Sequence, residues 1–265
     1  GVKYAADHGA SVINCSWGTT YHTQYGQDII NYATNNKGAV VIAAAGNSSA
    51  SNYLYPASFE NVISVGGVNS KDEIWIENAT TGSQFNNKID LVAPSQSIVA
   101  LNVGGGSGHI GYGTSFAAPI VAGVAALVRS EYPDASPQKV AAILKASTDS
   151  IYHIPVNEGF KGALGTGRVN ALKALSPVST PFITFHNHNA DDGLEQNFAV
   201  GDTVVLTVDL KNIWENPIAS PLGQNYLQKK LLATNIKPLA CTADFIMQSP
   251  PWVGGEHNYN YMKFL

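Results

Sequence analysis

The sequence predicts an α/β fold, in which a mostly parallel β-sheet carries helices on both faces and forms three layers in the order α, β, α. Two observations support this prediction. Uninterrupted apolar runs such as residues 39–45 alternate with stretches of helical periodicity such as residues 24–36. Strands of a parallel sheet read as continuous apolar runs because helices bury both of their faces.

The composition is that of a globular protein with a substantial core. Apolar residues make up 45% of the 265 residues and charged residues 13%, with a net charge of -4. This balance excludes disorder driven by charge, and it gives no electrostatic case for nucleic acid or an anionic membrane as a partner. No apolar run reaches the roughly 18 residues that a membrane span requires. Cys15 and Cys241 form neither a disulfide framework nor a metal-binding spacing.

Local signals place the expected elements within residues 1–175. Ser136 is a suitable helix N-cap and Pro137 a suitable first helical residue. Gly9 and Gly38 suit positions just after the end of a helix. We expect helices at residues 1–9, 24–36, 111–132, 136–146 and 169–175, and buried strands at residues 10–14, 39–45, 62–67 and 90–94.

The pattern changes after Ser176. Residues 182–185 and 203–210 alternate apolar and polar side chains, which is typical of antiparallel strands with one buried face. We therefore expect a partial β module, the start of a β-sandwich, over residues 177–213. Residues 214–265 contain several prolines that interrupt any long strand, and they stay unassigned.

The clearest candidate for chemistry is Ser115, which ends a Gly113-Thr114-Ser115 turn that leads into an apolar helix. Backbone N–H groups at a helix N-terminus lack intrahelical acceptors, and the helix dipole favours negative charge there. Asn47 follows the strand at residues 39–45, and ligands bind at the carboxyl ends of parallel strands. A helix N–H and a side-chain amide can together hold the oxyanion that forms when a hydroxyl attacks a carbonyl.

Each candidate residue also has a purely structural interpretation. Ser115 could serve only as the helix N-cap. Asn47 could be a turn residue with a positive φ angle. Trp17 could simply cover an apolar edge of the sheet. As long as each residue is considered alone, its structural interpretation stays open beside the functional one.

Three motifs together resemble a known family. They are Gly-Thr-Ser-Phe-Ala-Ala-Pro at residues 113–119, Ala-Ala-Gly-Asn at residues 44–47 and Val-Ile-Asn-Cys-Ser-Trp-Gly at residues 12–18. In their order along the chain they resemble the C-terminal part of the catalytic domain of subtilisin-like serine peptidases, the subtilases of peptidase family S8, over residues 1–175. The resemblance implies a subtilisin-like fold that is incomplete at its N-terminus. It also implies an extracellular or cell-surface serine endopeptidase that hydrolyses peptide bonds in protein or peptide substrates.

The resemblance implies roles for individual residues. Ser115 would be the nucleophile that forms the acyl-enzyme, and its backbone N–H and the Asn47 side chain would form the oxyanion hole. Thr114 would brace the turn. Small residues in the wall of the main specificity pocket would leave room for a large substrate side chain. The residues implied in substrate binding are Ser16, Trp17 and Gly18, as a strand that pairs with the substrate, and Ala44, Ala45 and Gly46, as the pocket wall.

A serine nucleophile needs a general base, normally a histidine oriented by an aspartate, and in subtilases both precede the serine. Neither motif is found here. His8 lies in the helix expected at residues 1–9, and the other histidines lack a family motif or follow Ser115: His22, His109, His153, His186, His188 and His257. We therefore expect a truncated chain that is not an efficient peptidase alone, and that is poorly soluble because a sheet edge is unpaired.

No cofactor for catalysis is expected, and no metal ligand is assigned. His186 and His188 could face one side of a strand, but no carboxylate or cysteine spacing supports a metal site there. Many members of the family bind structural calcium, which the resemblance allows here. No cluster of Asp, Asn or Glu residues identifies such a calcium site in the sequence.

Two other functions stay open. A subtilase-like pseudoenzyme, or a binding or structural module, would keep the sheet without the chemistry, and the presence of both Ser115 and Asn47 argues against this. An esterase of the α/β-hydrolase class needs the pattern Gly-x-Ser-x-Gly, and Ala117 stands where the last glycine should be.

Overall fold

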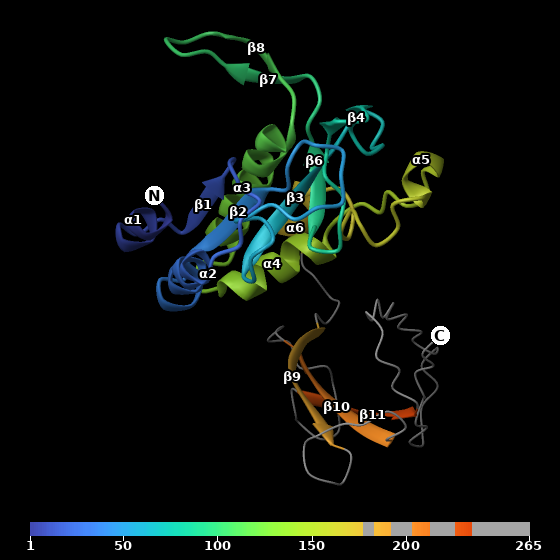
Figure 1. Cartoon of the computed structure of the whole chain (residues 1–265). Coiled ribbons are helices and arrows are strands. Elements are labelled where there is room, and N and C mark those ends of the chain that lie inside the picture. The colour runs from blue at the N-terminus through green and yellow to red at the C-terminus, as the bar shows by residue number, and fades with distance from the viewer. Residues whose placement is uncertain (177–182, 192–202, 213–225, 235–265) are drawn as a thin grey trace. The chain divides into compact units, whose positions relative to one another are not determined.

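The computed structural model describes residues 1–176, 183–191, 203–212 and 226–234. The chain divides into two compact units, Gly1–Thr180 and Pro181–Leu265, and Figure 1 shows the elements of each. Within the described residues, no helix is both long enough and apolar enough to cross a membrane.

A four-stranded parallel sheet forms the centre of the first unit, in the order β1-β2-β3-β6. Every residue of β2 and β3 is buried. The predicted parallel sheet of continuous apolar strands is therefore confirmed, for the reason that covering layers exclude water from both faces. The strands are β1 (Val12–Cys15), β2 (Val40–Ala44), β3 (Val62–Val68) and β6 (Leu91–Pro94).

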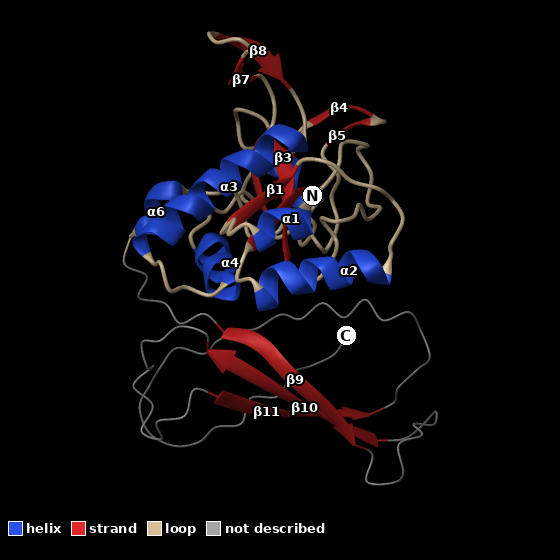
Figure 2. Ribbon diagram, turned by 90° about the vertical axis from the view of Figure 1, so that its left-hand side faces the viewer, coloured by secondary structure: helices blue, strands red, loops and turns tan. Residues whose placement is uncertain are grey.

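Helices cover both faces of this sheet and complete the three layers (Figure 2). Helix α3 packs against all four strands. Buried residues of the first helices, including Ile30 and Ala33, instead cluster with Val41 and Ala43 of β2. Because successive side chains of a strand face opposite sides, these two packings lie on opposite faces. The helices are α1 (Val2–Asp7), α2 (Gln24–Asn31), α3 (Thr114–Glu131), α4 (Pro137–Ala146), α5 (Pro155–Glu158) and α6 (Ala171–Leu175).

Two details of the helices differ from or sharpen the expectation. The helix expected at residues 24–36 is α2 followed by a π-helical turn, η1 (Tyr32–Asn36). The cap expected at Ser136 is confirmed, because its hydroxyl oxygen accepts a hydrogen bond from the Lys139 N–H at 3.1 Å. This bond satisfies one of the N–H groups that a helix start leaves without an acceptor.

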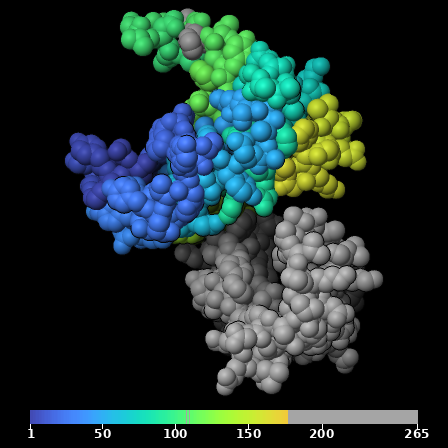
Figure 3. All heavy atoms as spheres, viewed as in Figure 1, coloured from blue at the N-terminus to red at the C-terminus, as the bar shows by residue number. Residues whose placement is uncertain are grey.

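Two antiparallel hairpins of the first unit were not expected from the sequence. They are formed by β4 (Ile76–Asn78) with β5 (Thr81–Gly82), and by β7 (Ile98–Leu101) with β8 (Ser107–Gly111). The β7–β8 hairpin stands out from the surface of the unit (Figure 1, Figure 3). Val99 and Leu101 are 64% and 82% exposed. A ribbon with so little burial has no alternating apolar pattern for sequence analysis to detect.

The second unit contains an antiparallel sheet of three strands in the order β11-β10-β9. The antiparallel strands expected at residues 182–185 and 203–210 correspond to β9 (Ile183–Asp191) and β10 (Thr203–Asn212). Strand β11 (Tyr226–Thr234) lies in the segment that the sequence left unassigned. His186 and His188 belong to β9. Cys241 and His257 lie outside the described residues.

Candidate active site

The turn before α3 presents Ser115 at the start of the helix. Gly113 is the N-cap and has a φ angle of 120°, a conformation that residues with a side chain rarely adopt. Its N–H donates to the Ser95 carbonyl at 2.7 Å, and its own carbonyl accepts from the Phe116 N–H at 2.9 Å. Ser115 is thus the second helical residue and half-buried. The interpretation of Ser115 as the N-cap is wrong, because Gly113 occupies that position.

Thr114 fixes the side-chain amide of Asn47. The backbone N–H and the hydroxyl of Thr114 both donate to Asn47 Oδ1 at 2.8 Å. A backbone N–H can only donate, so the amide oxygen must face Thr114 and the Nδ2 group must face away from it. Nδ2 lies 2.9 Å from the position that a Cβ atom would take on Gly113. The amide therefore holds an available N–H donor beside the turn that carries Ser115.

Asn47 itself is not the residue with a positive φ angle. That conformation belongs to the preceding Gly46, whose φ angle is 114°. The Gly46 N–H donates to the Thr114 hydroxyl oxygen at 3.1 Å. Thr114 is fully buried and so links both residues at the carboxyl end of β2 to the start of α3.

The segment after β1 closes the other side of the turn. The Ser16 hydroxyl donates to the Ser115 carbonyl at 2.8 Å, and the Ser115 hydroxyl donates to the Ser16 carbonyl at 3.3 Å. Trp17 is 59% exposed, so it does not act mainly as a cover for the sheet. It lines a cavity of about 400 Å³ together with other aromatic side chains, among them Tyr21, Tyr25 and Phe59.

The small residues of the expected pocket wall, Ala44–Gly46, are buried against other side chains of the chain. Ala44 and Ala45 are 3% and 2% exposed. A Cβ atom on Gly46 would lie 1.5 Å from Gln84 Oε1 and 3.3 Å from Leu54 Cδ2. The chain therefore requires glycine at position 46 to accommodate its own side chains, whatever a substrate requires.

Only neutral groups take part in the hydrogen bonds that join Ser16, Gly46, Asn47, Thr114 and Ser115. Among the histidines whose side chains the structure describes, His8, His22 and His153, none hydrogen-bonds to Ser115. His8 instead contacts the Tyr4 carbonyl through Nδ1 at 2.8 Å, and His22 packs edge-on against Tyr55. The structure thus brings the serine, the amide and the Ser16 segment together, and none of His8, His22 and His153 takes part in their hydrogen bonds.

Cys15 adjoins the site but is not a second nucleophile. It is 1% exposed, and burial raises the pKa of its thiol to about 11. A thiol with this pKa stays protonated at neutral pH, and the thiolate is the nucleophilic form. The prediction that Cys15 is a small buried side chain is confirmed. Among the described side chains, no group of three or more His, Cys, Asp or Glu could hold a metal ion.

Comparison with known proteins gives the family. The Subtilase family model matches residues 1–200. The chain belongs to the subtilase family. This subtilase is similar to the thermophilic serine proteinase of Bacillus sp. (strain AK1), with 45% identity over 130 residues that make up 49% of the chain and 31% of the relative. It is 37% identical to thermitase of Thermoactinomyces vulgaris over 175 residues, which make up 66% of the chain and 57% of thermitase.

The fold of this subtilase is also similar to solved structures. The match to the prenylagaramide maturation protease PagA has a TM-score of 0.56 and 28% sequence identity, and it covers 66% of the chain and 64% of PagA. Compared with the two sequence relatives, the matched part of the chain spans about three fifths of the length of thermitase and less than a third of the length of the Bacillus proteinase.

Sequence reasoning about the subtilase site missed residues that support the predicted ones. Ser95 holds the turn through its carbonyl, and Leu54 and Gln84 lie against Gly46. None of the three has a local sequence signal, because each contact joins segments far apart in the chain. The sequence signals these contacts only through Gly18 and Gly46, because a glycine beside a strand often marks a place where other atoms approach the backbone closely.

Proposed function

We propose that the full-length protein containing this chain is a serine endopeptidase that hydrolyses peptide bonds in protein substrates through an acyl-enzyme on Ser115. The observation that carries the proposal is the locked Asn47 amide, whose oxygen accepts both Thr114 donors at 2.8 Å. This lock leaves Nδ2 as a donor beside Ser115. A donor held in place before reaction costs no reorganisation when the oxyanion forms.

The remaining backbone geometry supports the same chemistry. The Ser115 N–H is among the first four of α3, which have no intrahelical acceptor. When the Ser115 hydroxyl attacks a peptide carbonyl, this N–H and Asn47 Nδ2 would donate to the developing oxyanion. The segment Ser16–Gly18 leads away from an edge strand, β1, and would pair with the extended substrate.

The general base is proposed to come from residues outside this chain. The Ser115 hydroxyl hydrogen-bonds to the Ser16 carbonyl, which cannot take up its proton. Since none of His8, His22 and His153 hydrogen-bonds to the hydroxyl, a histidine and its orienting aspartate would be supplied by another part of the full-length protein. This chain alone would then not turn over substrate efficiently. An extracellular or cell-surface location and a structural calcium ion are further proposals that rest on the family.

Labelling with a fluorophosphonate tests the proposed function. The reagent reacts with an activated serine, so the full-length wild-type protein should be labelled at Ser115, as mapped by peptide mass spectrometry. Ser115→Ala should abolish the labelling, whereas Ser130→Ala, at an exposed serine of α3, should leave it unchanged. A folded wild-type protein without label at Ser115 would instead favour a pseudoenzyme or a binding module.

A further inference from the structure

The groups that surround Ser115 define where the side chain of the acylating substrate residue must lie. Segments Ser16–Gly18 and Ala44–Gly46 continue from the carboxyl ends of β1 and β2, which are adjacent and parallel (Figure 1). Ser115 hydrogen-bonds to the first segment, and Asn47 directly follows the second. A carbonyl attacked by Ser115 with its oxygen at Asn47 would place its side chain between the two segments, in the specificity pocket that the family resemblance implies, which we call the acyl pocket.

Leu54 lies against both walls of the acyl pocket, at Gly18 and at Gly46. Its Cδ2 atom lies 2.5 Å from the position of a Cβ atom on Gly18 and 3.3 Å from the position of a Cβ atom on Gly46. The tip of one leucine side chain is therefore in contact range of both walls. Glycine at positions 18 and 46 makes room for this leucine, in addition to any room that it leaves for substrate.

The backbone around Leu54 holds the side chain in this position. The next residue, Tyr55, exchanges two hydrogen bonds with Thr19, at 2.7 Å and 2.8 Å. The Leu54 carbonyl accepts from the Ser58 N–H at 2.8 Å. The backbone on the C-terminal side of Leu54 is thus tied to neighbouring segments, and one of these ties joins it to Thr19, the residue after Gly18.

Gln84 prevents the acyl pocket from deepening behind Gly46. Its side chain is 1% exposed, and its Nε2 donates to the Asn52 side-chain oxygen at 2.5 Å. Its Oε1 fills the space where a Cβ on Gly46 would be, at 1.5 Å, and has no hydrogen-bond partner in the described part of the chain. The wall behind Gly46 is therefore solid protein.

We propose that Leu54 is the specificity-determining residue of the acyl pocket and restricts this subtilase to small side chains, such as that of alanine, at the residue that acylates Ser115. The proposal rests on the proposed peptidase function and names its substrate class. It reverses the expectation from the sequence that small wall residues leave room for a large side chain. An aromatic ring would have to displace Leu54 from its contacts with Gly18 and Gly46.

Two peptides that differ only at the acylating residue, alanine in one and phenylalanine in the other, test this proposal with the full-length protein. We expect kcat/KM to favour alanine by at least about tenfold, the discrimination that one pocket contact can supply. Leu54→Ala should raise kcat/KM for phenylalanine and reverse the preference. Leu54→Val should give an intermediate ratio. Leu172→Ala, at a leucine of α6 that is 79% exposed, should keep the wild-type ratio.

The outcomes separate this inference from the proposed function. A wild-type protein that cleaves after phenylalanine faster than after alanine overturns the inference, even if Leu54→Ala does not fold. An unchanged ratio in a folded Leu54→Ala variant overturns it as well. In both cases turnover and fluorophosphonate labelling at Ser115 leave the peptidase function standing. Absence of both labelling and turnover in the wild type overturns the two proposals together.

Discussion

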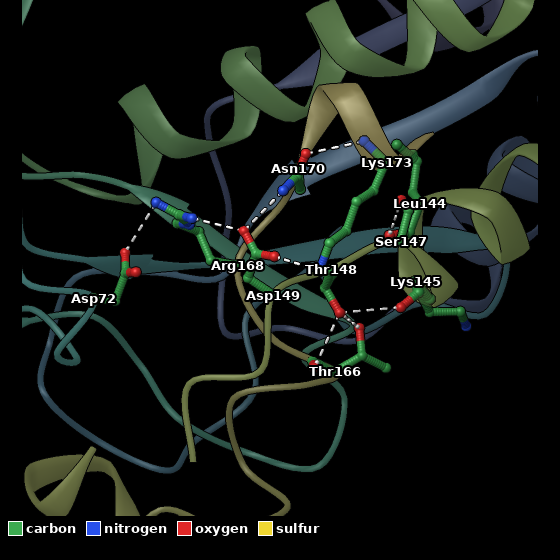
Figure 4. Close-up of polar contacts among 10 residues, drawn as sticks. All are labelled: Asp72, Leu144, Lys145, Ser147, Thr148, Asp149, Thr166, Arg168, Asn170 and Lys173. Carbon is green, nitrogen blue, oxygen red and sulfur yellow. Dashed lines mark hydrogen bonds and ion pairs between the residues drawn. The ribbon is translucent and has the colours of Figure 1, made fainter. Parts of the chain in front are cut away.

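Two polar clusters of the first unit use different chemistry to join distant segments. The neutral cluster consists of Ser16, Gly46, Asn47, Thr114 and Ser115, which are joined by hydrogen bonds between uncharged groups. The ionic cluster consists of Asp72, Asp149, Arg168, Asn170 and Lys173 (Figure 4).

Asp149 is the centre of the ionic cluster. Its carboxylate accepts from Lys173 at 2.6 Å, from Arg168 at 2.7 Å and from Asn170 at 2.9 Å. Lys173 makes the largest contribution, followed by Arg168, and together they hold the pKa of Asp149 well below its usual range. Backbone hydrogen bonds between Asp149 and Arg168, at 2.8 Å and 2.9 Å, join the same two segments.

The proposed function explains why the neutral cluster around Ser115 contains no charged group. A carboxylate near Asn47 would compete with an oxyanion for its N–H donor, and a like charge close by raises the energy of any new anion. The hydrogen bonds of the neutral cluster use Oδ1 of Asn47 and leave its Nδ2 group as a donor. The ionic cluster directs the Arg168 and Lys173 side chains at the carboxylates of Asp72 and Asp149, so it joins segments of the fold through opposite charges.

The largest expected effect comes from breaking the neutral cluster at Asn47. Asn47→Ala in the full-length protein should lower kcat by roughly 10²–10³-fold, a magnitude known from a subtilisin, because one oxyanion donor is lost. KM for a good peptide substrate should change little. Steady-state kinetics measures both, with Asn36→Ala, at an exposed residue of η1, as control. An unchanged kcat would show that Asn47 has only a structural role.

Substitutions of Thr114 test whether its hydrogen bonds to Asn47 and Gly46 stabilise the fold. Thr114→Val removes the hydroxyl that donates to Asn47 Oδ1 and accepts from the Gly46 N–H. Asn47 Oδ1 keeps the Thr114 backbone N–H, but the buried Gly46 N–H loses its acceptor, which should lower the free energy of unfolding by about 2–3 kcal/mol. Thr114→Ser keeps the hydroxyl and should cost about 1 kcal/mol, the value of one buried methyl group. Denaturant unfolding compares them, and equal losses would contradict the role of the hydroxyl.

The contribution of the ionic cluster to the free energy of unfolding should depend on pH, whereas that of the neutral cluster should not. At neutral pH, Asp149→Asn should lower the free energy of unfolding by about 1–2 kcal/mol, since the side chain is partly exposed to solvent. The folded-state pKa of Asp149 lies below the unfolded value. Its contribution is therefore complete above about pH 4 and is lost as the pH falls through the folded pKa.

Unfolding experiments from pH 7 downward check this prediction. The gap between the wild type and Asp149→Asn should narrow in acid, whereas the gap for Thr114→Val should stay constant. A gap for Asp149→Asn that is independent of pH would mean that the hydrogen-bond geometry, and not the charge, provides the stability.

The smallest effect is expected for an exposed ion pair. Lys88 and Glu60 are 2.5 Å apart, but their side chains are 42% and 72% exposed. Lys88→Met should change the free energy of unfolding by less than about 1 kcal/mol, and about 1 M salt should remove the difference. A larger loss that survives salt would show that charge pairing stabilises this chain even outside a network.

The fold was predictable where burial leaves a periodic signal. Strand β2 is buried on both faces, so its sequence is continuously apolar. The cap at Ser136 was predictable because a capping bond spans only three residues. The β7–β8 hairpin was not, because Val99 and Leu101 are apolar although they are exposed, so the sequence of β7 does not alternate as its burial does.

The sequence by itself determined the family and the identity of the candidate nucleophile, since the motif around Ser115 and the Ala-Ala-Gly-Asn motif ending at Asn47 are both local. Only the tertiary structure decided how the side chains around these motifs are oriented and which distant residues they contact. Thr114 orients the Asn47 amide, and Leu54 lies between Gly18 and Gly46. The reason is physical: caps and periodic burial depend on neighbours within a few residues, whereas these contacts exist only after β1, β2 and α3 have packed together.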